Sequence, residues 1–304
     1  MGFEYDVVGM GLNAVDHICV IPRFPKYDEK LRMVDFKRSP GGQVASALVA
    51  CSRWGLKTRY IGKFGGDEMG DFSYRSLEVE GIDLRYCKKI DGALNQFAFI
   101  MVDKQTGERT IIWKRDERLA MTPDEVPIDA ITSGRYLLLD GHDALAAAKA
   151  ASEAKRHGIE VVVDGETIKD GTKELVMSCD YLVCTRSFAS NFTGSSDLNN
   201  ALDLISSMGI RWVVVTLGKD GAIARMGARV LRSPGFKVNC VDSTGAGDVF
   251  HGAFVYGLCK GWELEGILDF SNAAAALNCT ELGARGGIKS LSTIFDLIKN
   301  GERW

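Results

Sequence analysis

The sequence predicts a doubly wound α/β fold, in which helices flank a mostly parallel β-sheet and a small second sheet is attached. Short, continuous apolar runs are typical of strands that a parallel sheet buries on both faces. Such runs occur at residues 5–8, 58–61, 136–139, 161–163, 181–183 and 212–216. Helical patterns separate most of these runs or follow the last one, at residues 44–54, 144–157, 198–208, 248–260 and 262–279. Repeated alternation of strand and helix indicates a doubly wound domain.

Two segments depart from this pattern because apolar and polar residues roughly alternate in them. They span residues 14–38 and 93–114. In the second, residues 95–102 and 109–114 flank a turn at 103–107 and predict an antiparallel hairpin. Neither segment is long enough for a core of its own, so the small sheet must pack on the main domain, on a partner chain or over a ligand. We expect a lid. The rest of the chain is the predicted core, at residues 1–13, 39–92 and 115–304.

The composition is that of an ordinary globular protein, with 46% hydrophobic residues, 25% charged residues and a formal net charge of −3. Lys and Arg are scattered, which argues against nucleic acid or an anionic membrane as a partner. No stretch approaches the roughly 18 apolar residues of a membrane helix, and the first residues are acidic where a signal peptide is basic. The eight cysteines lack metal-binding spacing and are expected to be reduced thiols. We expect a cytoplasmic protein.

The strongest functional signal is the segment Val241-Asp-Ser-Thr-Gly-Ala-Gly-Asp-Val-Phe-His-Gly-Ala-Phe254. The small residues Gly245, Ala246 and Gly247 allow backbone N–H groups to point into one space at the start of a helix, where the helix dipole also favours an anion. The carboxylate of Asp248 follows directly. It is placed to accept a proton from a hydroxyl that attacks a phosphoryl group bound there. The alternative is a glycine-rich turn in which Asp248 caps the helix.

These residues resemble the carboxyl-terminal signature of the ribokinase-like (PfkB) carbohydrate kinases, and the resemblance extends from Asp16 to Gly287. It implies the ribokinase-like fold. It also implies that Asp248 is the base that activates a sugar hydroxyl, and that the amides of the Gly-Ala-Gly turn form an anion hole for the transferring phosphoryl group. The ketohexokinase and sulfofructose kinase branch is the most similar, on the segments at 107–111, 248–253 and 279–287.

A second segment, Pro40-Gly-Gly-Gln-Val-Ala-Ser-Ala47, resembles the family's amino-terminal signature. Glycines at 41 and 42 allow close approach of the backbone to a ligand and a flexible joint between lid and core. The resemblance implies that the sugar is bound by Asp16, Gly41, Gly42, Gln43 and Ser46. The family commonly has asparagine where Ser46 stands, so the bound sugar is expected to differ. A polar helix start is the alternative for Gln43 and Ser46, and a solvated turn residue is the alternative for Asp16.

The nucleotide is expected at the end of the strand at 212–216. The resemblance implies that Thr216, Gly218 and Gly221 line the phosphates or the ribose of ATP, and that Asn272 lies in the adenine pocket. No GxxxxGK[ST] motif occurs, which argues against a P-loop kinase. The segment at 9–14 matches the dinucleotide fingerprint GxGxxA, but the residues after it favour a strand over the required helix.

Metal binding is predicted at two places. The resemblance implies a monovalent-cation site, with K⁺ the expected ion, built from Asp242, Thr244, Asn278, Glu281 and Gly283. Many relatives have an Asn-x-x-Glu motif linked to Mg²⁺ where this chain has Thr185-Arg-Ser-Phe188. Because that carboxylate is missing, we expect water and nucleotide oxygens to hold Mg²⁺.

The predicted function is ATP-dependent phosphorylation of a primary hydroxyl of a small sugar, of ketose or sugar-acid type. Alternatives are a nucleoside kinase, for which Phe97 and Phe99 are candidate stacking residues, and a catalytically weak sugar-binding regulatory protein. A dehydrogenase is disfavoured. His251 is expected to pack rather than to transfer protons. Pairing of an exposed lid sheet between two chains predicts a homodimer.

Overall fold

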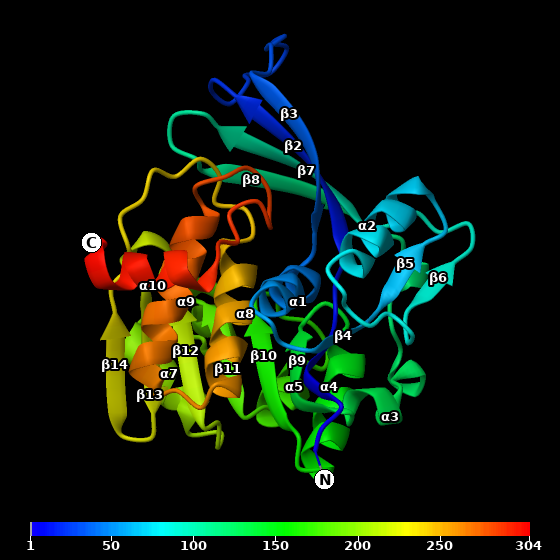
Figure 1. Cartoon of the computed structure of the whole chain (residues 1–304), viewed down its shortest axis with the longest axis vertical. Helices are drawn as coiled ribbons and strands as arrows, with labels where there is room; N and C mark the ends of the chain where they lie inside the picture. Colours follow the sequence, from blue (N-terminus) through cyan, green and yellow to red (C-terminus); the bar gives the residue numbers. More distant parts are fainter. Residues whose placement is uncertain (1) are drawn as a thin grey trace.

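The computed structural model describes residues 2–304 and is built around an eight-stranded sheet, ordered β14-β13-β12-β11-β10-β9-β1-β4 (Figure 1). Its strands are β1 (Tyr5–Met10), β4 (Thr58–Ile61), β9 (Gly134–Asp140), β10 (Glu160–Gly165), β11 (Tyr181–Thr185), β12 (Trp212–Thr216), β13 (Ala222–Met226) and β14 (Arg229–Ser233). The strands from β4 to β12 pair in parallel, whereas β13 and β14 are antiparallel additions. The predicted doubly wound, mostly parallel sheet is therefore confirmed.

Helices cover both faces of this sheet, because successive apolar side chains of each strand point to opposite sides. In β1, Val7 belongs to one buried cluster and Val8 to the other. One face packs against α1 (Gln43–Arg53), α8 (Ala246–Cys259), α9 (Leu264–Asn278) and α10 (Leu291–Asn300). The other face packs against α3 (Ile128–Ile131), α4 (Ala144–Arg156), α5 (Thr172–Met177), α6 (Arg186–Thr193) and α7 (Leu198–Ser206).

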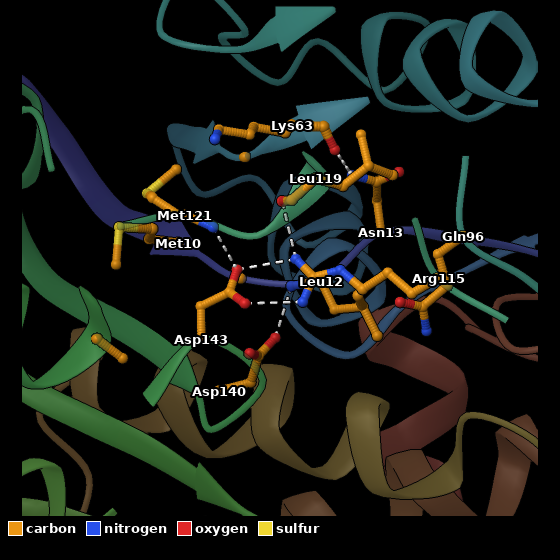
Figure 2. Close-up of a pocket in the computed structure, with 13 residues that line it drawn as sticks. Met10, Leu12, Asn13, Lys63, Gln96, Arg115, Leu119, Met121, Asp140 and Asp143 are labelled. Carbon is orange, nitrogen blue, oxygen red and sulfur yellow. Dashed lines mark hydrogen bonds and ion pairs between the residues drawn. The ribbon is translucent and has the colours of Figure 1, made fainter. Parts of the chain in front are cut away.

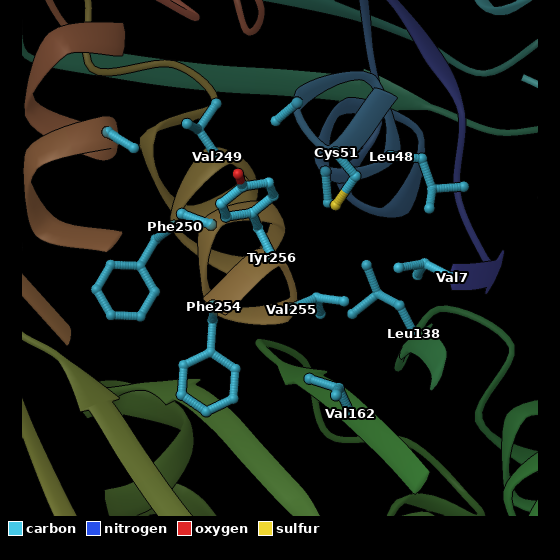
Figure 3. Close-up of a cluster of buried hydrophobic side chains, with 14 of the residues drawn as sticks. Val7, Leu48, Cys51, Leu138, Val162, Val249, Phe250, Phe254, Val255 and Tyr256 are labelled. Atoms are coloured by element: carbon cyan, nitrogen blue, oxygen red, sulfur yellow. The ribbon is translucent and has the colours of Figure 1, made fainter. Parts of the chain in front are cut away.

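Helix α8 begins at the predicted catalytic residues. It is apolar on nearly all sides and largely buried. Figure 3 shows Val249, Phe254 and Val255 of α8 facing the sheet and α1. Gly252 is required where α8 meets α1, since a Cβ there would lie 2.6 Å from the carbonyl oxygen of Ala47. Close packing of this kind leaves little freedom to shift, so the first turn of α8 is held rigidly at the edge of the sheet.

A separate four-stranded sheet stands above the carboxyl ends of the central strands (Figure 1). Its order is β3 (Asp35–Gly41), β2 (Ala14–Ile21), β7 (Phe97–Asp103) and β8 (Arg109–Lys114). The predicted hairpin is present, because β7 and β8 pair antiparallel, but β2 and β7 pair in parallel. Ile18, Ile100 and Val102 are buried on the inner face of this sheet, where Leu282 of the core packs against them.

The remaining elements are peripheral to the site. Helix α2 (Glu68–Glu78) and a two-stranded parallel sheet of β5 (Lys63–Gly65) and β6 (Lys88–Ile90) lie beside the second sheet (Figure 1). The segment after the glycines at 9–14 continues directly into β2, so it lacks the helix that a dinucleotide fingerprint requires. Within residues 2–304, no helix combines the length and apolar character needed to cross a membrane.

Candidate active site

The predicted anion hole lies at the start of α8, at the carboxyl edge of the central sheet. Gly245 has a left-handed backbone (φ 74°) and precedes the first helical residue, Ala246. A Cβ on Gly245 would collide with the backbone of Ala284. The space beside Gly247 is open, as an anion site requires. The Ala246 N–H already donates to the Ser243 carbonyl at 3.3 Å, so of the three predicted amides those of Gly245 and Gly247 are the better donors to a ligand.

Asp248 lies in the first turn of α8 and is partly exposed to the space between the two sheets. Burial among protein atoms raises its pKa to about 6, and the charge of Glu166 acts in the same direction. His251, Arg109 and Arg285 oppose this shift. A carboxylate with a pKa near 6 is largely ionised at neutral pH and still basic enough to accept a proton, which is the property a general base needs.

Asp16 on β2 faces the same region from the second sheet. It is only 6% exposed, and burial followed by the charge of Asp248 raises its pKa to about 7. The two carboxylates therefore influence each other across the cleft. Gly41 is required beside Asp16, because a Cβ on Gly41 would collide with the Asp16 carboxylate. Gly42 has a φ of 94° and caps α1, and a Cβ there would collide with Asn13.

Arg285 is a buried cation that the sequence analysis did not single out. It is 5% exposed, and burial lowers its pKa to about 10 although Asp16 and Asp248 act against that shift. Its guanidinium donates to the Gly41 carbonyl (2.9 Å), to Ser46 Oγ (3.1 Å) and to Ser76 Oγ (3.1 Å). The sequence places the segment at 279–287 in the expected cation site and in the resemblance to a kinase branch, but nothing in its local pattern identifies Arg285 as a site residue.

Gln43 and Ser46, both predicted to bind sugar, lie in different environments. Gln43 Nε2 donates to Glu166 Oε2 (2.7 Å) and Asp164 Oδ2 (3.2 Å), while its Oε1 is buried without a hydrogen-bond partner. The hydroxyl of Ser46 is fully buried and accepts from Arg285. The structure thus presents Gln43 to the cleft, and it assigns Ser46 to holding Arg285 instead of the predicted contact with a sugar.

Asp164 and His251 form a buried pair beneath the first turn of α8. The pKa of Asp164 is raised well above its usual range by burial and by the charges of Glu166 and Asp248. His251 Nε2 lies 3.3 Å from Asp164 Oδ1, and its Nδ1 lies 2.7 Å from the Gly247 carbonyl oxygen. His251 therefore holds the turn that carries Gly247 and Asp248, in agreement with a packing role.

The predicted nucleotide residues gather at the ends of β12 and β14. Thr216 ends β12, and the following turn contains Gly218 (φ 61°) and Gly221 (φ 89°), where a Cβ on Gly221 would collide with the Ser233 carbonyl. Asn272 Nδ2 donates to Ser233 O (3.0 Å) and Oγ (2.7 Å). Ser233 Oγ in turn donates to Asp269 Oδ1 (2.7 Å). Asn272 is thus held through its amide nitrogen, which leaves its carbonyl oxygen as the group available to a base. Ser233 and Asp269 were not predicted.

Four of the five predicted cation-site residues come together. The two oxygens of the buried Asp242 carboxylate accept from the N–H groups of Thr244 and Gly283, each at 2.8 Å. Asn278 Nδ2 donates to the carbonyl oxygens of Thr244 and Ala284. Thr244 Oγ1 is buried without a partner, which fits an oxygen ligand for a monovalent ion. Glu281 does not join them, because its carboxylate is exposed and pairs with Lys289 at the surface.

No cluster of three or more His, Cys, Asp or Glu side chains suited to a metal occurs in the described part of the chain. Thr185 caps α6 by accepting from the Phe188 N–H (3.1 Å), and Phe188 is buried in the core. The carboxylates nearest to Asp248 come from the end of β10 instead, where Glu166 is exposed. A Mg²⁺ ion there would need nucleotide oxygens or water to complete its ligands.

A partly exposed carboxylate beside helix amides that can bind an anion is the arrangement that a phosphotransferase acting on a hydroxyl group requires. Comparison with known proteins agrees. The model described as "pfkB family carbohydrate kinase" matches residues 6–291, and the chain belongs to this family of ATP-dependent sugar kinases.

Several relatives share this architecture over nearly their whole length. A ribokinase of Staphylococcus aureus is 30% identical and the match covers 95% of this chain and 98% of that protein. A deoxyribokinase of Salmonella typhi is 26% identical, with 98% and 100% covered. The crystal structure of a ribokinase from Thermotoga maritima is 26% identical, superposes with a TM-score of 0.84 and covers 97% of this chain and 100% of that one. The ketohexokinase and sulfofructose kinase branch remains a prediction.

The raised pKa of Asp248 predicts that this residue lowers stability at neutral pH. The native state binds the Asp248 proton more tightly than the unfolded chain, whose carboxyl titrates near 3.8. The native state is therefore penalised increasingly as the pH rises from about 4 to about 6, and fully above 6. We expect Asp248→Asn to have a higher Tm than the wild type at pH 7.5, with a smaller difference at pH 4.5. Calorimetry at both pH values measures this; an equal difference at both would contradict the prediction.

Proposed function

We propose that the enzyme phosphorylates a primary hydroxyl of a small, uncharged sugar at the expense of ATP, with Asp248 as general base. The observation that carries this proposal is the position of Asp248 in the first turn of α8, between the amides of Gly245 and Gly247 and the facing carboxylate of Asp16. A sugar held by Asp16 and Gln43 would lie next to the base. The phosphoryl group would lie next to the amides.

In the proposed reaction, Asp248 accepts the proton of the attacking hydroxyl as its oxygen approaches the γ-phosphorus of ATP in line. The amides of Gly245 and Gly247 stabilise the negative charge on the transferring group, aided by the helix dipole. Positioning contributes further, because Asp16 and Gln43 restrict the sugar to one orientation. Mg²⁺, when bound, would neutralise charge on the nucleotide phosphates, and Glu166 is the carboxylate that best fits an interaction with it.

The nucleotide would occupy the turn that follows β12. Gly218 and Gly221 allow close approach of phosphate or ribose, and the free carbonyl oxygen of Asn272 can accept from the amino group of adenine. A monovalent ion such as K⁺ would bind at Thr244 Oγ1, behind the anion hole. We expect it to stabilise the loop that joins Asp242 to Gly245.

The charges around the cleft favour a ketose over a sugar acid. Asp16, Asp248 and Glu166 lie in this region without a hydrogen-bonded cationic partner. Among the neighbouring cations, Arg285 is engaged with three protein oxygens and Arg115 with the Asp143 carboxylate (2.7 and 2.8 Å). Arg109, which donates to Ser243 Oγ (2.7 Å), offsets only part of the negative charge. A carboxylate or phosphate on the sugar would therefore meet like charge, whereas hydroxyl groups can donate to these oxygens.

The two residues predicted to stack on a nucleoside, Phe97 and Phe99, lie away from the cleft. Phe97 and Phe99 lie on the outer face of the second sheet, where Phe99 stacks with His17 at 5.2 Å between ring centroids. Neither ring faces the cleft that contains Asp16, because alternate residues of a strand point to opposite faces. Their position on the face opposite to Asp16 disfavours stacking on a purine bound in the cleft.

A screen for ATP consumption with ketoses, aldoses, sugar acids and nucleosides tests the proposed function directly. We expect turnover with at least one neutral ketose or aldose and little with sugar acids. Asp248→Asn should reduce kcat by at least about 100-fold, because it removes the general base, and should retain a cooperative melting transition. Near-normal turnover of this variant, or ligand binding without turnover across the whole panel, would contradict the mechanism.

The pH dependence of the reaction follows from the same carboxylate. Because Asp248 acts as a base only when ionised and its pKa is about 6, kcat/KM should fall roughly tenfold per pH unit below 6 and level off above it. Steady-state assays with a saturating Mg²⁺–ATP concentration between pH 5 and 8 provide the profile. A rate that does not change over this range would assign the base to another group.

We also propose that the second sheet serves as a lid and as the interface of a homodimer. His17, Phe36, Phe97 and Phe99 form an aromatic cluster on its outer face, and Phe36 and Phe99 remain 50% and 49% exposed. Ile112 extends this surface on β8. Exposed apolar patches of this kind mark protein interaction sites, and a second copy of the same sheet is self-complementary by symmetry.

Disruption of the aromatic cluster should produce a monomer. Phe99→Glu places a charge at the centre of the outer face, so we expect it to halve the mass measured by analytical ultracentrifugation. Lys155→Glu, which changes an exposed residue of α4 far from the sheet, is the control and should leave the mass unchanged. A wild-type protein that sediments as a monomer at micromolar concentration would overturn the proposed interface.

A further inference from the structure

A small cavity is lined by residues of the core and by Gln96, which directly precedes β7 (Figure 2). Its wall includes Asn13, whose backbone adjoins Gly42 of the predicted sugar site. Its volume is about 20 Å³, which is room for one water-sized group. The polar side chains around it are those of Asn13, Lys63, Gln96, Arg115, Asp140 and Asp143. Neither the sequence motifs nor the proposed mechanism uses Gln96.

Most of the polar groups around the cavity are committed to the protein. Asp140 accepts from the N–H groups of Leu12 (2.6 Å) and His142 (3.0 Å). Arg115 forms a two-pronged pair with Asp143, as Figure 2 shows. Asn13 donates to Tyr60 and Lys63 and accepts from Ser73.

Gln96 is the exception. It is 5% exposed, yet its Oε1 is buried without a hydrogen-bond partner, and among the cavity-lining side chains of residues 2–304 no other buried polar atom lacks one. A buried acceptor without a donor is costly, so such a group in a native protein requires an explanation. A hydrogen-bond donor for Gln96 Oε1 can therefore come only from a molecule or group that enters the cavity.

The register of the lid places Gln96 on the same face as Asp16. Asp16 pairs with Ala98, and Gln96 lies two residues before Ala98, so Gln96 and Ala98 point to the same side. The bond from the Val15 N–H to the Gln96 carbonyl (3.0 Å) shows that the ladder continues to this position. Gln96 therefore faces the cleft one step nearer the joint between lid and core.

We propose that Gln96 and this cavity form a specificity subsite that accepts one hydroxyl group of the sugar, at the end remote from the hydroxyl that Asp248 activates. This inference rests on the proposed function. The hydroxyl donates to Gln96 Oε1 and takes the place of a single water molecule. A carboxylate or a fully ionised phosphate is disfavoured, because it lacks the proton that Gln96 Oε1 needs. The subsite thus selects an uncharged polyhydroxy substrate.

The test combines a change in the enzyme with a change in the substrate. The probes are D-fructose, 1-deoxy-D-fructose and 6-deoxy-D-fructose, each of the analogues lacking one primary hydroxyl. We expect Gln96→Leu to lower kcat/KM for D-fructose at least about tenfold. For the analogue without the remote hydroxyl, the kcat/KM of the wild type should already be about tenfold lower than for D-fructose. Gln96→Leu should lower the kcat/KM for this analogue little further, since both changes remove the same hydrogen bond.

Two controls separate this role from a structural one. Gln105→Leu alters an exposed glutamine in the turn between β7 and β8 and should match the wild type with all three sugars. Gln96→Leu should melt at the same temperature as the wild type or higher, because the side-chain oxygen Oε1 of Gln96 has no partner in the protein. A lower Tm together with equal losses for D-fructose and for the analogue without the remote hydroxyl would show that Gln96 only supports the fold, and would overturn the proposal.

Equal kcat/KM values for Gln96→Leu and the wild type with D-fructose would mean that the cavity holds only a resident water, which also overturns the proposal. Failure of the wild type to phosphorylate D-fructose, while it phosphorylates a nucleoside or a sugar acid, would instead contradict the proposed substrate class. That result would also contradict the proposed subsite, because the subsite rests on the substrate class. The two failures are distinguished by the wild-type assay alone.

Discussion

The geometry of the cleft depends on the hydrogen bonds that the buried Arg285 donates. This residue comes from the loop after α9, yet its three hydrogen bonds reach the end of β3, α1 and α2. A guanidinium is suited to this task, because its donors have fixed directions and it stays charged when buried. Removing one partner from a buried charge network typically costs about 3–5 kcal/mol. The position of Gly41, and with it the contact between Gly41 and Asp16, therefore depends on a residue far away in the sequence.

The same cation contributes to how acidic the cleft is. Burial raises the pKa values of Asp16 and Asp248, and Arg285 counteracts part of this effect at both residues, as Arg109 also does. Asp248 consequently remains ionised at neutral pH while it retains the basicity of a half-buried carboxylate. The excess of negative charge that remains is tolerable for hydroxyl groups, which donate, and unfavourable for anionic sugars. Catalytic tuning and substrate preference thus have one electrostatic origin.

Sequence reasoning succeeded where local pattern determines structure. The six central strands are continuous apolar runs because both of their faces are buried, and the Gly-Ala-Gly turn needs its first glycine because the backbone of Ala284 leaves no room for a Cβ on Gly245. Sequence reasoning did not give the parallel pairing of β2 with β7, since pairing of strands about 80 residues apart depends on the path of the whole chain. Arg285, Gln96 and Glu166 were missed for the same reason. Each acts through partners that are remote in the sequence.

Two predicted residues show that a match to a family motif does not by itself establish the role of a side chain. Ser46 occupies a position that resembles a sugar-binding asparagine, but its short side chain is fully buried and serves Arg285. Glu281 lies in the predicted cation loop, but its longer side chain reaches the surface and Lys289. At both positions the backbone lies in the segment that the family resemblance indicates. The side chain determines whether the residue can take the role that the resemblance implies.

With the second sheet as the proposed lid, its contacts with the core would keep water from the phosphoryl group. In this structure the turn between β7 and β8 already touches the loop before the anion hole. Ser243 donates to the Gly107 carbonyl through both its N–H (3.2 Å) and its Oγ (3.2 Å), and Arg109 donates to Ser243 Oγ (2.7 Å). These bonds connect the far end of the lid to the segment that carries Gly245. A sugar that bridges Asp16 on the lid and Asp248 on the core would strengthen this closure, so that binding of the correct substrate and exclusion of water become one event.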